Sequence, residues 1–309
     1  MNELELIRAL LPILPTNASV VTGAGDDCAV LDVGLADRHL LFKTDAVVEG
    51  IHFDDQTPGH SVGHKALARC LSDIAAMGGT PLCALATIGL PRGFDPARVE
   101  AIYRGMAGLA TQYDVAIVGG ETTTNPERLF ASIAMLGTVG QTSCLRRSGA
   151  KAGDALFVTG TLGGSRAGKH LEFEPRVREG QWLAGRGTVH AMIDLSDGLA
   201  TDLRHLLEAS GTGAELLAEA IPVSAEARRR SGQSGAPAPL AAALTDGEDF
   251  ELLLAAAASD AVALLDAWKS AFPQLPLHCI GKITAEHGLR IRDRQGARPL
   301  DEHGYIHFA

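Results

Sequence analysis

Carboxylates that lie beside glycines, or at the ends of expected strands and helices, are the side chains of this chain best suited to chemistry. They occur in Gly25-Asp26-Asp27, Thr44-Asp45, Ser72-Asp73, Gly119-Gly120-Glu121-Thr122-Thr123, Asp194-Leu195-Ser196-Asp197-Gly198 and Gly247-Glu248-Asp249. Taken singly, each motif has an ordinary explanation as a polar turn, a helix cap or an ion pair. Carboxylates that converge repel one another and require divalent cations between them. Oxygen ligands suit Mg²⁺, whose coordination is often completed by substrate phosphates. Together the motifs predict a multi-metal site for phosphoryl transfer.

Asp45 and Asp73 have the most informative surroundings. Asp45 follows an apolar strand expected over His39–Thr44 and precedes Val47-Val48. A carboxylate between two buried runs needs a cation or several hydrogen-bond donors, because burying an unpaired charge costs several kcal/mol. Asp73 lies at the edge of the apolar face of an expected helix, where it can reach a ligand. An ion pair with Arg69, one turn earlier, is the alternative explanation for Asp73.

Other motifs for catalysis are weaker. Gly163–His170 comes close to the phosphate-loop pattern GxxxxGK[ST], but His170 replaces the hydroxyl that binds Mg²⁺, so we interpret it as a chance match. His60 and His64 have the spacing of a metal pair, yet the start of a helix explains them. His52 follows Asp45 closely and is a better candidate for substrate contact. We find no Gly-x-Ser-x-Gly elbow and no series of protein-kinase motifs.

Strand and helix patterns alternate along the chain, and these elements must position the acids. In the first part we expect strands over 28–33, 39–44, 82–90, 115–118 and 130–139, with helices over 61–77 and from Asp95-Pro96 to about 112. In the second part we expect strands over 155–158, 189–193, 214–217, 250–255, 278–283 and 289–292, with helices from about 163 and over 199–210 and 260–271. Residues 141–153 lack apolar periodicity and place a domain boundary, giving domains 1–140 and 141–309. The fold class is α/β (α+β).

Composition bounds the class of protein. The chain has 309 residues, of which 46% are hydrophobic, enough for two domains. Its formal net charge of -10 argues against a generic nucleic-acid surface, since phosphate backbones attract Lys and Arg. The longest apolar runs are too short to span a membrane, and the N-terminus lacks the features of a signal peptide. The 5 cysteines lie far apart and indicate small buried side chains in a reducing cytoplasm.

An ordered series of motifs resembles the thiamine-monophosphate kinase family. The segments are GDDCAVL (25–31), KTDAVVEGIHF (43–53), ALARCLSDIAAMGG (66–79), IVGGETT (117–123), RRSGAKAGD (146–154), VTGTLGGS (158–165), IDLSDGL (193–199), GEDFELL (247–253) and GYIHFA (304–309). The resemblance implies ATP-dependent phosphorylation of thiamine monophosphate to thiamine diphosphate. It also implies the two-domain fold of aminoimidazole ribonucleotide synthetase, with mixed sheets flanked by helices, and a homodimer.

The resemblance further implies roles for the two domains and for single residues. The domain 1–140 would bind ATP and Mg²⁺ and dimerise, and the domain 141–309 would complete the active-site cleft. Several Mg²⁺ ions, with ATP as co-substrate, would be bound by Asp27, Thr44, Asp45, Asp73, Glu121, Asp194 and Asp197. The nucleotide would contact Gly120, Glu121, Arg147 and Ser196, and the thiamine substrate His52, Glu248 and Tyr305. No side chain would act as a catalytic base, because metal-assisted transfer from ATP to the substrate phosphate is direct.

Three features depart from the family pattern. Glu121 stands where the family usually has Asp, which keeps the carboxylate but lengthens it. Lys43 stands where many members carry a small hydroxyl residue, so its ammonium could repel one Mg²⁺ or substitute for one. The stretch between Gly168 and Glu174 is short. Alternatives are another ATP-dependent enzyme of this fold, a phosphatase using the same metals, and a non-catalytic protein that binds divalent metals.

Overall fold

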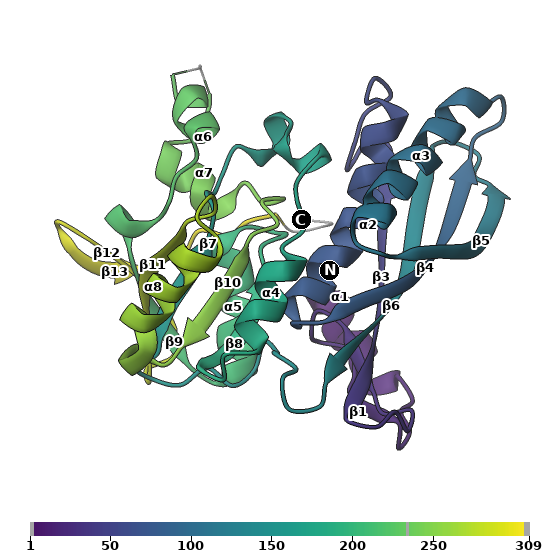
Figure 1. The fold of residues 1–309 in the computed structure, drawn as a ribbon. Coiled ribbons are helices and arrows are strands. Elements are labelled where there is room, and N and C mark those ends of the chain that lie inside the picture. The colour runs from purple at the N-terminus through teal and green to yellow at the C-terminus, as the bar shows by residue number, and fades with distance from the viewer. Residues whose placement is uncertain (1–2, 233–234, 306–309) are drawn as a thin grey trace. The chain divides into compact units, whose positions relative to one another are not determined.

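The computed structural model describes residues 3–232 and 235–305, so the last four residues of the GYIHFA segment lie outside the described residues. The chain forms two compact units (Figure 1). The N-terminal unit comprises residues 17–144 and 170–181, and the C-terminal unit comprises residues 1–16, 145–169 and 182–309. Neither unit is a continuous range of the chain. Residues 1–16 belong to the C-terminal unit, and residues 170–181 belong to the N-terminal unit. The functional division into 1–140 and 141–309 stays a prediction.

The N-terminal unit is built on a six-stranded sheet of order β1-β2-β3-β6-β4-β5. The parallel neighbours in this sheet are β4 and β5, and the other strand pairs are antiparallel. Buried and less buried residues alternate along β6, as expected for a sheet with one covered face. The strands are β1 Val20–Thr22, β2 Ala29–Leu31, β3 Arg38–Val48, β4 Thr80–Leu90, β5 Ala116–Thr124 and β6 Phe130–Gly140.

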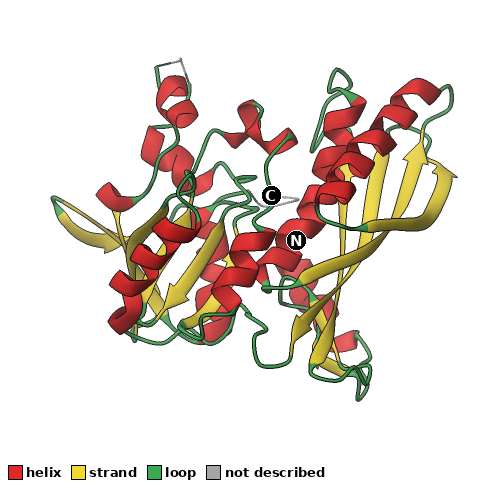
Figure 2. Cartoon of the chain, viewed as in Figure 1, coloured by secondary structure: helices red, strands yellow, loops and turns green. Residues whose placement is uncertain are grey.

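Helices α2 (Gly59–Ala76) and α3 (Pro96–Gln112) lie side by side over one face of this sheet (Figures 1 and 2). Asp95 caps α3 by accepting a hydrogen bond of 2.9 Å from the Ala97 amide, as the Asp-Pro pair predicts. The two backbones approach closely at a glycine. A Cβ atom added at Gly105 would lie 2.0 Å from the carbonyl oxygen of His60. This contact fixes α2, which carries Asp73, against α3.

The C-terminal unit has a seven-stranded sheet of order β13-β12-β9-β11-β7-β10-β8. Strands β9 and β12 pair in parallel, and the remaining pairs are antiparallel. Every residue of β7 and β10 is buried, so these central strands form the core of the unit. The strands are β7 Ala155–Thr159, β8 Val189–Asp194, β9 Gly213–Leu217, β10 Leu252–Ala256, β11 Leu277–Thr284, β12 Gly288–Asp293 and β13 Gly296–Pro299.

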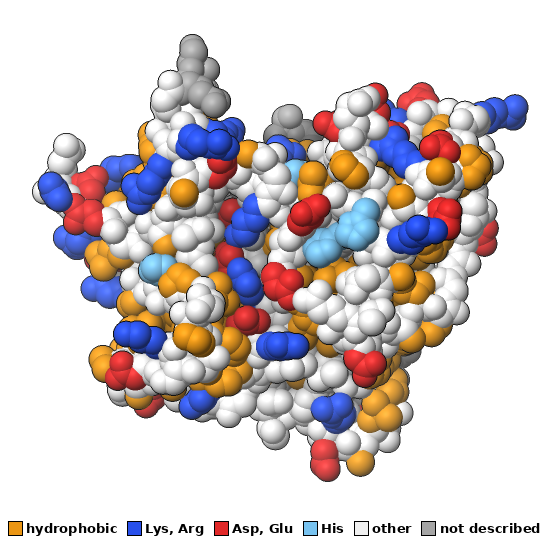
Figure 3. Space-filling model, turned by 45° about the horizontal axis from the view of Figure 1, so that its top comes forward, with side chains coloured by type: hydrophobic (Ala, Val, Ile, Leu, Met, Phe, Trp, Pro, Cys, Tyr) orange, Lys and Arg blue, Asp and Glu red, His pale blue; other side chains and the backbone are white. Residues whose placement is uncertain are grey.

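The remaining α-helices are α1 Glu3–Leu10, α4 Val177–Ala184, α5 Leu199–Ser210, α6 Ala225–Arg230, α7 Pro239–Thr245 and α8 Ala261–Ala271. Acidic and basic side chains are interspersed on the face shown in Figure 3. Among residues 3–232 and 235–305, no helix combines the length and the apolar character needed to cross a membrane.

The expected mixed sheets flanked by helices are confirmed, but several element boundaries are wrong. The strand expected over 39–44 continues to Val48, and the one expected over 115–118 continues to Thr124. The helix expected from Gly163 is instead a pair of short 3₁₀ turns, Ser165–Ala167 and Lys169–Leu171. The three glycines at 163, 164 and 168 have positive φ, which an α-helix cannot accommodate.

We expect Gly105→Ala to lower the free energy of unfolding by about 2 kcal/mol, because the added methyl collides with the backbone of α2. Gly108→Ala, on the same helix, is the matched control, since its added Cβ meets nothing within 4 Å. This control should stabilise by about 0.5–1 kcal/mol through helix propensity. Urea denaturation of both variants measures the difference, and equal stabilities would contradict the close contact.

Candidate functional site

Asp27 and Asp73 bring two buried carboxylates together in the N-terminal unit. Asp27 lies two residues before β2 begins and Asp73 lies on α2, and their side chains are almost inaccessible to solvent. One carboxylate oxygen of each lies within 4.8 Å of the other. Two negative charges at this separation and burial require a cation. The donor set, buried and made only of carboxylate oxygens, fits Mg²⁺.

Lys43 supplies one positive charge to this pair. Its Nζ atom lies 2.9 Å from Oδ1 of Asp73, with the Lys43 side chain 23% exposed. Burial alone would lower the pKa of Lys43, but attraction to Asp73 and Asp45 outweighs it and raises the pKa above its usual value. The ammonium is therefore charged at neutral pH. The departure at position 43 is thus an ion pair with one of the predicted metal ligands.

Asp45 is held by Arg69, which lies on α2. Arg69 donates from Nε to Oδ2 at 2.8 Å and from Nη2 to Oδ1 at 3.0 Å, a bidentate pair. Although burial opposes ionisation, Arg69 lowers the pKa of Asp45 below its usual value. The expectation that Asp45 needs a cation is confirmed. The alternative that pairs Arg69 with Asp73 stays a prediction. The placement of Asp45 at a strand end is wrong, because β3 continues to Val48.

Strand alternation separates Thr44 from its neighbours. Lys43 and Asp45 contact side chains of α2, so Thr44, between them, presents its side chain to the opposite face of β3. Its hydroxyl lies 3.4 Å from that of Ser132 on β6. The predicted metal-binding role of Thr44 stays a prediction.

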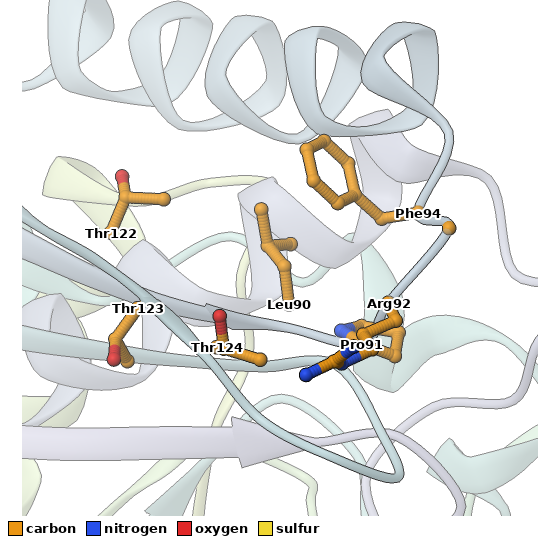
Figure 4. A pocket seen from close by; sticks show the side chains of 8 residues that line it. Leu90, Pro91, Arg92, Phe94, Thr122, Thr123 and Thr124 are labelled. Carbon is orange, nitrogen blue, oxygen red and sulfur yellow. The ribbon is translucent and has the colours of Figure 1, made fainter.

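We expected Gly120 and Glu121 to follow the end of a strand, but they lie inside the edge strand β5. A Cβ atom added at Gly120 would lie 1.8 Å from the carbonyl oxygen of Ala86, so glycine is required by the close approach of β4. Glu121 is exposed. Further along β5, residues 122–124 and the 90–94 segment line a hollow of about 520 Å³. The side chains of Thr122 and Thr124 point to the same side, and that of Thr123 points to the other (Figure 4).

His52 is positioned from two sides. Its Nδ1 accepts a hydrogen bond of 3.1 Å from the Val48 amide, so the neutral ring carries its proton on Nε2. Its carbonyl oxygen accepts a hydrogen bond of 2.7 Å from Nζ of Lys65, a fully buried residue of α2. Lys65 also lies 2.7 Å from Nδ1 of His170. Sequence reasoning missed Lys65 because α2 is buried on nearly every side, so no polar stripe marks it.

The short stretch after Gly168 is anchored to α2 and α3. Glu172 accepts a hydrogen bond of 3.0 Å from the Ser61 hydroxyl, and the Tyr113 hydroxyl donates one of 2.6 Å to Glu174. His64 lies 2.9 Å from the carbonyl oxygen of Phe173, which agrees with a structural role for this histidine. The short stretch is thus a packed part of the N-terminal unit.

In the C-terminal unit, Asp194 ends β8 and the turn to Gly198 leads into α5. The N-cap of α5 is Gly198, and no side chain makes a capping hydrogen bond there. Instead Oδ2 of Asp202 accepts hydrogen bonds of 3.0 Å from the amides of Asp197 and Gly198. Burial, then Asp197 and Asp194, raise the pKa of Asp202. Asp202 therefore holds the turn that carries Asp194, Ser196 and Asp197.

Arg147 acts on the same helix. Its carbonyl oxygen accepts 3.0 Å from the Ser210 hydroxyl at the end of α5. Its charge, after burial, helps to lower the pKa of His205 to about 4, so His205 is neutral. It also favours the ionised form of Asp202. The positive charge of Arg147 thus acts on side chains of α5 that include Asp202, which holds the acidic turn.

Glu248 and Tyr305 both contact Arg166, which sequence reasoning missed. Nε of Arg166 lies 3.6 Å from Oε2 of Glu248, and its guanidinium lies 5.4 Å from the centre of the Tyr305 ring. Glu248 and Phe250 have φ angles of 57° and 49°, a left-handed conformation rare outside glycine. Strain of this kind often marks functional sites.

The Gly163–His170 segment does not form a phosphate loop. The Gly163 amide donates 3.0 Å to both carboxylate oxygens of Asp249, and the Gly164 amide donates 2.8 Å to Asp246. Burial raises the pKa of Asp249 to about 7. Since these amides already serve carboxylates, they are not directed at a phosphate, and the interpretation of a chance match is confirmed.

Comparisons with known proteins agree along the whole chain. Models of AIR synthase related protein match its N-terminal domain at residues 25–139 and its C-terminal domain at residues 129–294. The thiamine-monophosphate kinase of Rhodopirellula baltica is 40% identical over 93% of this chain and 92% of its own. That of Salmonella typhimurium is 37% identical over 100% of this chain and 98% of its own. The structure of AaThiL complexed with AMPPCP and TMP has a TM-score of 0.84 and 29% identity, covering 99% of this chain and 97% of its own.

We expect Asp202→Ala to lower the free energy of unfolding by about 2 kcal/mol, because two buried amides lose their acceptor. Asp202→Asn keeps a carbonyl oxygen that can accept both hydrogen bonds, so it should cost less than about 1 kcal/mol. Chemical denaturation of the two variants tests this. If both lose the same stability, Asp202 does not anchor the turn through its oxygen.

Proposed function

The chain belongs to the AIR synthase related family and, within it, to the thiamine-monophosphate kinases, and on that premise we propose that it transfers the γ-phosphate of ATP to thiamine monophosphate. The products are thiamine diphosphate and ADP. The likeness to a structure holding AMPPCP and TMP, which extends over nearly the whole chain, carries this proposal.

The transfer is direct and in line. An oxygen of the substrate phosphate forms a bond to the γ-phosphorus of ATP while the bond from that phosphorus to the β,γ-bridging oxygen breaks. A phosphate monoester is already ionised near neutral pH, since its second pKa is about 6. No side chain has to remove a proton, and catalysis rests on positioning and charge compensation.

Carboxylates of both units bind Mg²⁺. The N-terminal unit would use Asp27, Asp45, Asp73 and Glu121, and the C-terminal unit Asp194 and Asp197. The side chain of Thr44 faces away from Asp45 and Asp73 and would not share their ion. Bound Mg²⁺ supplies positive charge that neutralises phosphate oxygens and stabilises the transferring group. The buried, all-oxygen pair Asp27–Asp73 and the anchored turn at Asp194 support this assignment.

Nucleotide and substrate are assigned to further residues of these units. Gly120 and Glu121, with Arg147 and Ser196, contact ATP, and the planar guanidinium of Arg147 suits phosphate. His52, Glu248 and Tyr305 bind thiamine monophosphate. The proton on Nε2 makes His52 a donor, and the ring of Tyr305 offers a stacking surface. A cytoplasmic location is part of the same proposal.

The expected activity is formation of thiamine diphosphate and ADP in equal amounts, dependent on Mg²⁺ and on thiamine monophosphate. Chromatography of the nucleotide and thiamine products measures it. Release of inorganic phosphate in place of thiamine diphosphate would indicate a phosphatase, and no turnover at all a metal-binding homologue. A phosphorylated protein formed during turnover would contradict direct transfer.

A homodimer forms through the face of the N-terminal sheet that α2 and α3 leave uncovered. Thr44, Ala134 and Leu85 are paired across β3, β6 and β4, so they share this face. It exposes large apolar side chains, including Phe42 and Leu85, each 47% exposed. Apolar patches of this kind mark protein interfaces. The occupant is a second copy of the chain, as the resemblance implies.

Leu85→Glu places a charge on this face and should convert the dimer to monomers. Sedimentation analysis of the molecular mass measures the change. Leu217→Glu is the control, because Leu217 lies in the C-terminal unit and is 42% exposed. This variant should have the same molecular mass in solution as the wild-type assembly. A wild-type protein that is monomeric, or a Leu85→Glu variant that stays dimeric, would refute this interface.

A further inference from the structure

Lys43 occupies a position where it competes with metal ions for a carboxylate. It is two residues from Asp45 on β3, so both side chains point to α2. Both oxygens of Asp45 are already engaged by the Arg69 fork. The Lys43 ammonium is directed to the next acid, Asp73, at 2.9 Å. The geometry is that of a cation bound to a carboxylate, with the chain itself supplying the cation.

We propose that the Lys43 ammonium is a permanent member of the metal site, replacing one divalent ion at the Asp27–Asp73 pair. This inference rests on the proposed function, because that function assigns the pair to metal binding. It goes further in stating that this chain binds fewer ions than the same site would without the lysine.

Charge counting supports the replacement. Asp27, Asp45 and Asp73 contribute three negative charges, while Lys43 and Arg69 contribute two positive ones. Each of these two built-in cations offsets one carboxylate before any metal binds. A second divalent ion at the same pair would lie close to the Lys43 ammonium, which repels it.

The environment keeps Lys43 in this role. Its Nζ atom lies 2.9 Å from Oδ1 of Asp73, a side chain only 8% exposed, so the ammonium is held against a carboxylate that is nearly removed from water. Cys28, adjacent to Asp27, is fully buried, which indicates a poorly hydrated surrounding. In such a surrounding a retained cation is favoured over an empty, doubly negative pair.

The test measures Mn²⁺ binding to the full-length protein without nucleotide or substrate. Isothermal titration calorimetry and the electron paramagnetic resonance signal of free Mn²⁺ report the binding. Lys43→Met removes the charge at similar length, and Lys43→Ser removes it with a small hydroxyl. Both variants should bind one more Mn²⁺ per chain than the wild type, or bind it at least about tenfold more tightly. Their thermal midpoints should also rise more on addition of Mn²⁺.

Lys282→Met is the control, because Lys282 is a surface residue 4.0 Å from Glu215 and 62% exposed, and its Mn²⁺ binding should match the wild type. If folded Lys43→Met and Lys43→Ser bind Mn²⁺ like the wild type, or less, the inference is overturned. Product analysis of the wild type separates the two proposals. If the wild type is an active kinase but the Lys43 variants bind Mn²⁺ as it does, only this inference is refuted. If the wild type is inactive but the variants bind Mn²⁺ differently from it, only the kinase assignment is refuted.

Discussion

Buried negative charge is the constraint on which the rest of this structure depends. A carboxylate removed from water must be compensated, and the compensation decides where strands and helices pack. In the N-terminal unit the compensating groups are side chains, with Lys43 at Asp73 and Arg69 at Asp45. Both links connect β3 with α2, so the ion pairs that prepare the site also fix the helix on the sheet.

The C-terminal unit solves the same problem with backbone amides. Asp202 accepts from Asp197 and Gly198, and Asp249 accepts from Gly163. Burial raises the pKa values of both acids, and the amide dipoles, which carry only partial charge, lower them too little to offset it. The benefit is geometric. Each carboxylate fixes a glycine-containing turn that neighbours a predicted ligand, which places Asp197 and Glu248 without a regular element.

The sequence predicted local features better than tertiary ones. The helix over 199–210 and the cap at Asp95 follow from periodicity and capping chemistry, and both are confirmed. The need of Asp45 for a cation was also predictable, but its partner was not, because Arg69 is adjacent only once α2 packs on β3. The role of Asp202 was not predicted, because the side chain that caps a helix normally comes from the residue before its first turn, and Asp202 lies inside α5. The roles taken from the family resemblance, and the joint use of both units' residues in one reaction, stay predictions.

A built-in cation changes how folding and metal binding are linked. Where only metals neutralise a buried acidic pair, the fold is stabilised in proportion to metal saturation. Lys43 and Arg69 travel with the chain, so the carboxylates of the N-terminal unit are largely compensated before any ion arrives. The helix that carries Asp73 can then adopt its position without metal. On the proposed function, divalent ions would then mainly neutralise the charge that the nucleotide phosphates bring, which would couple their binding more to substrate than to folding.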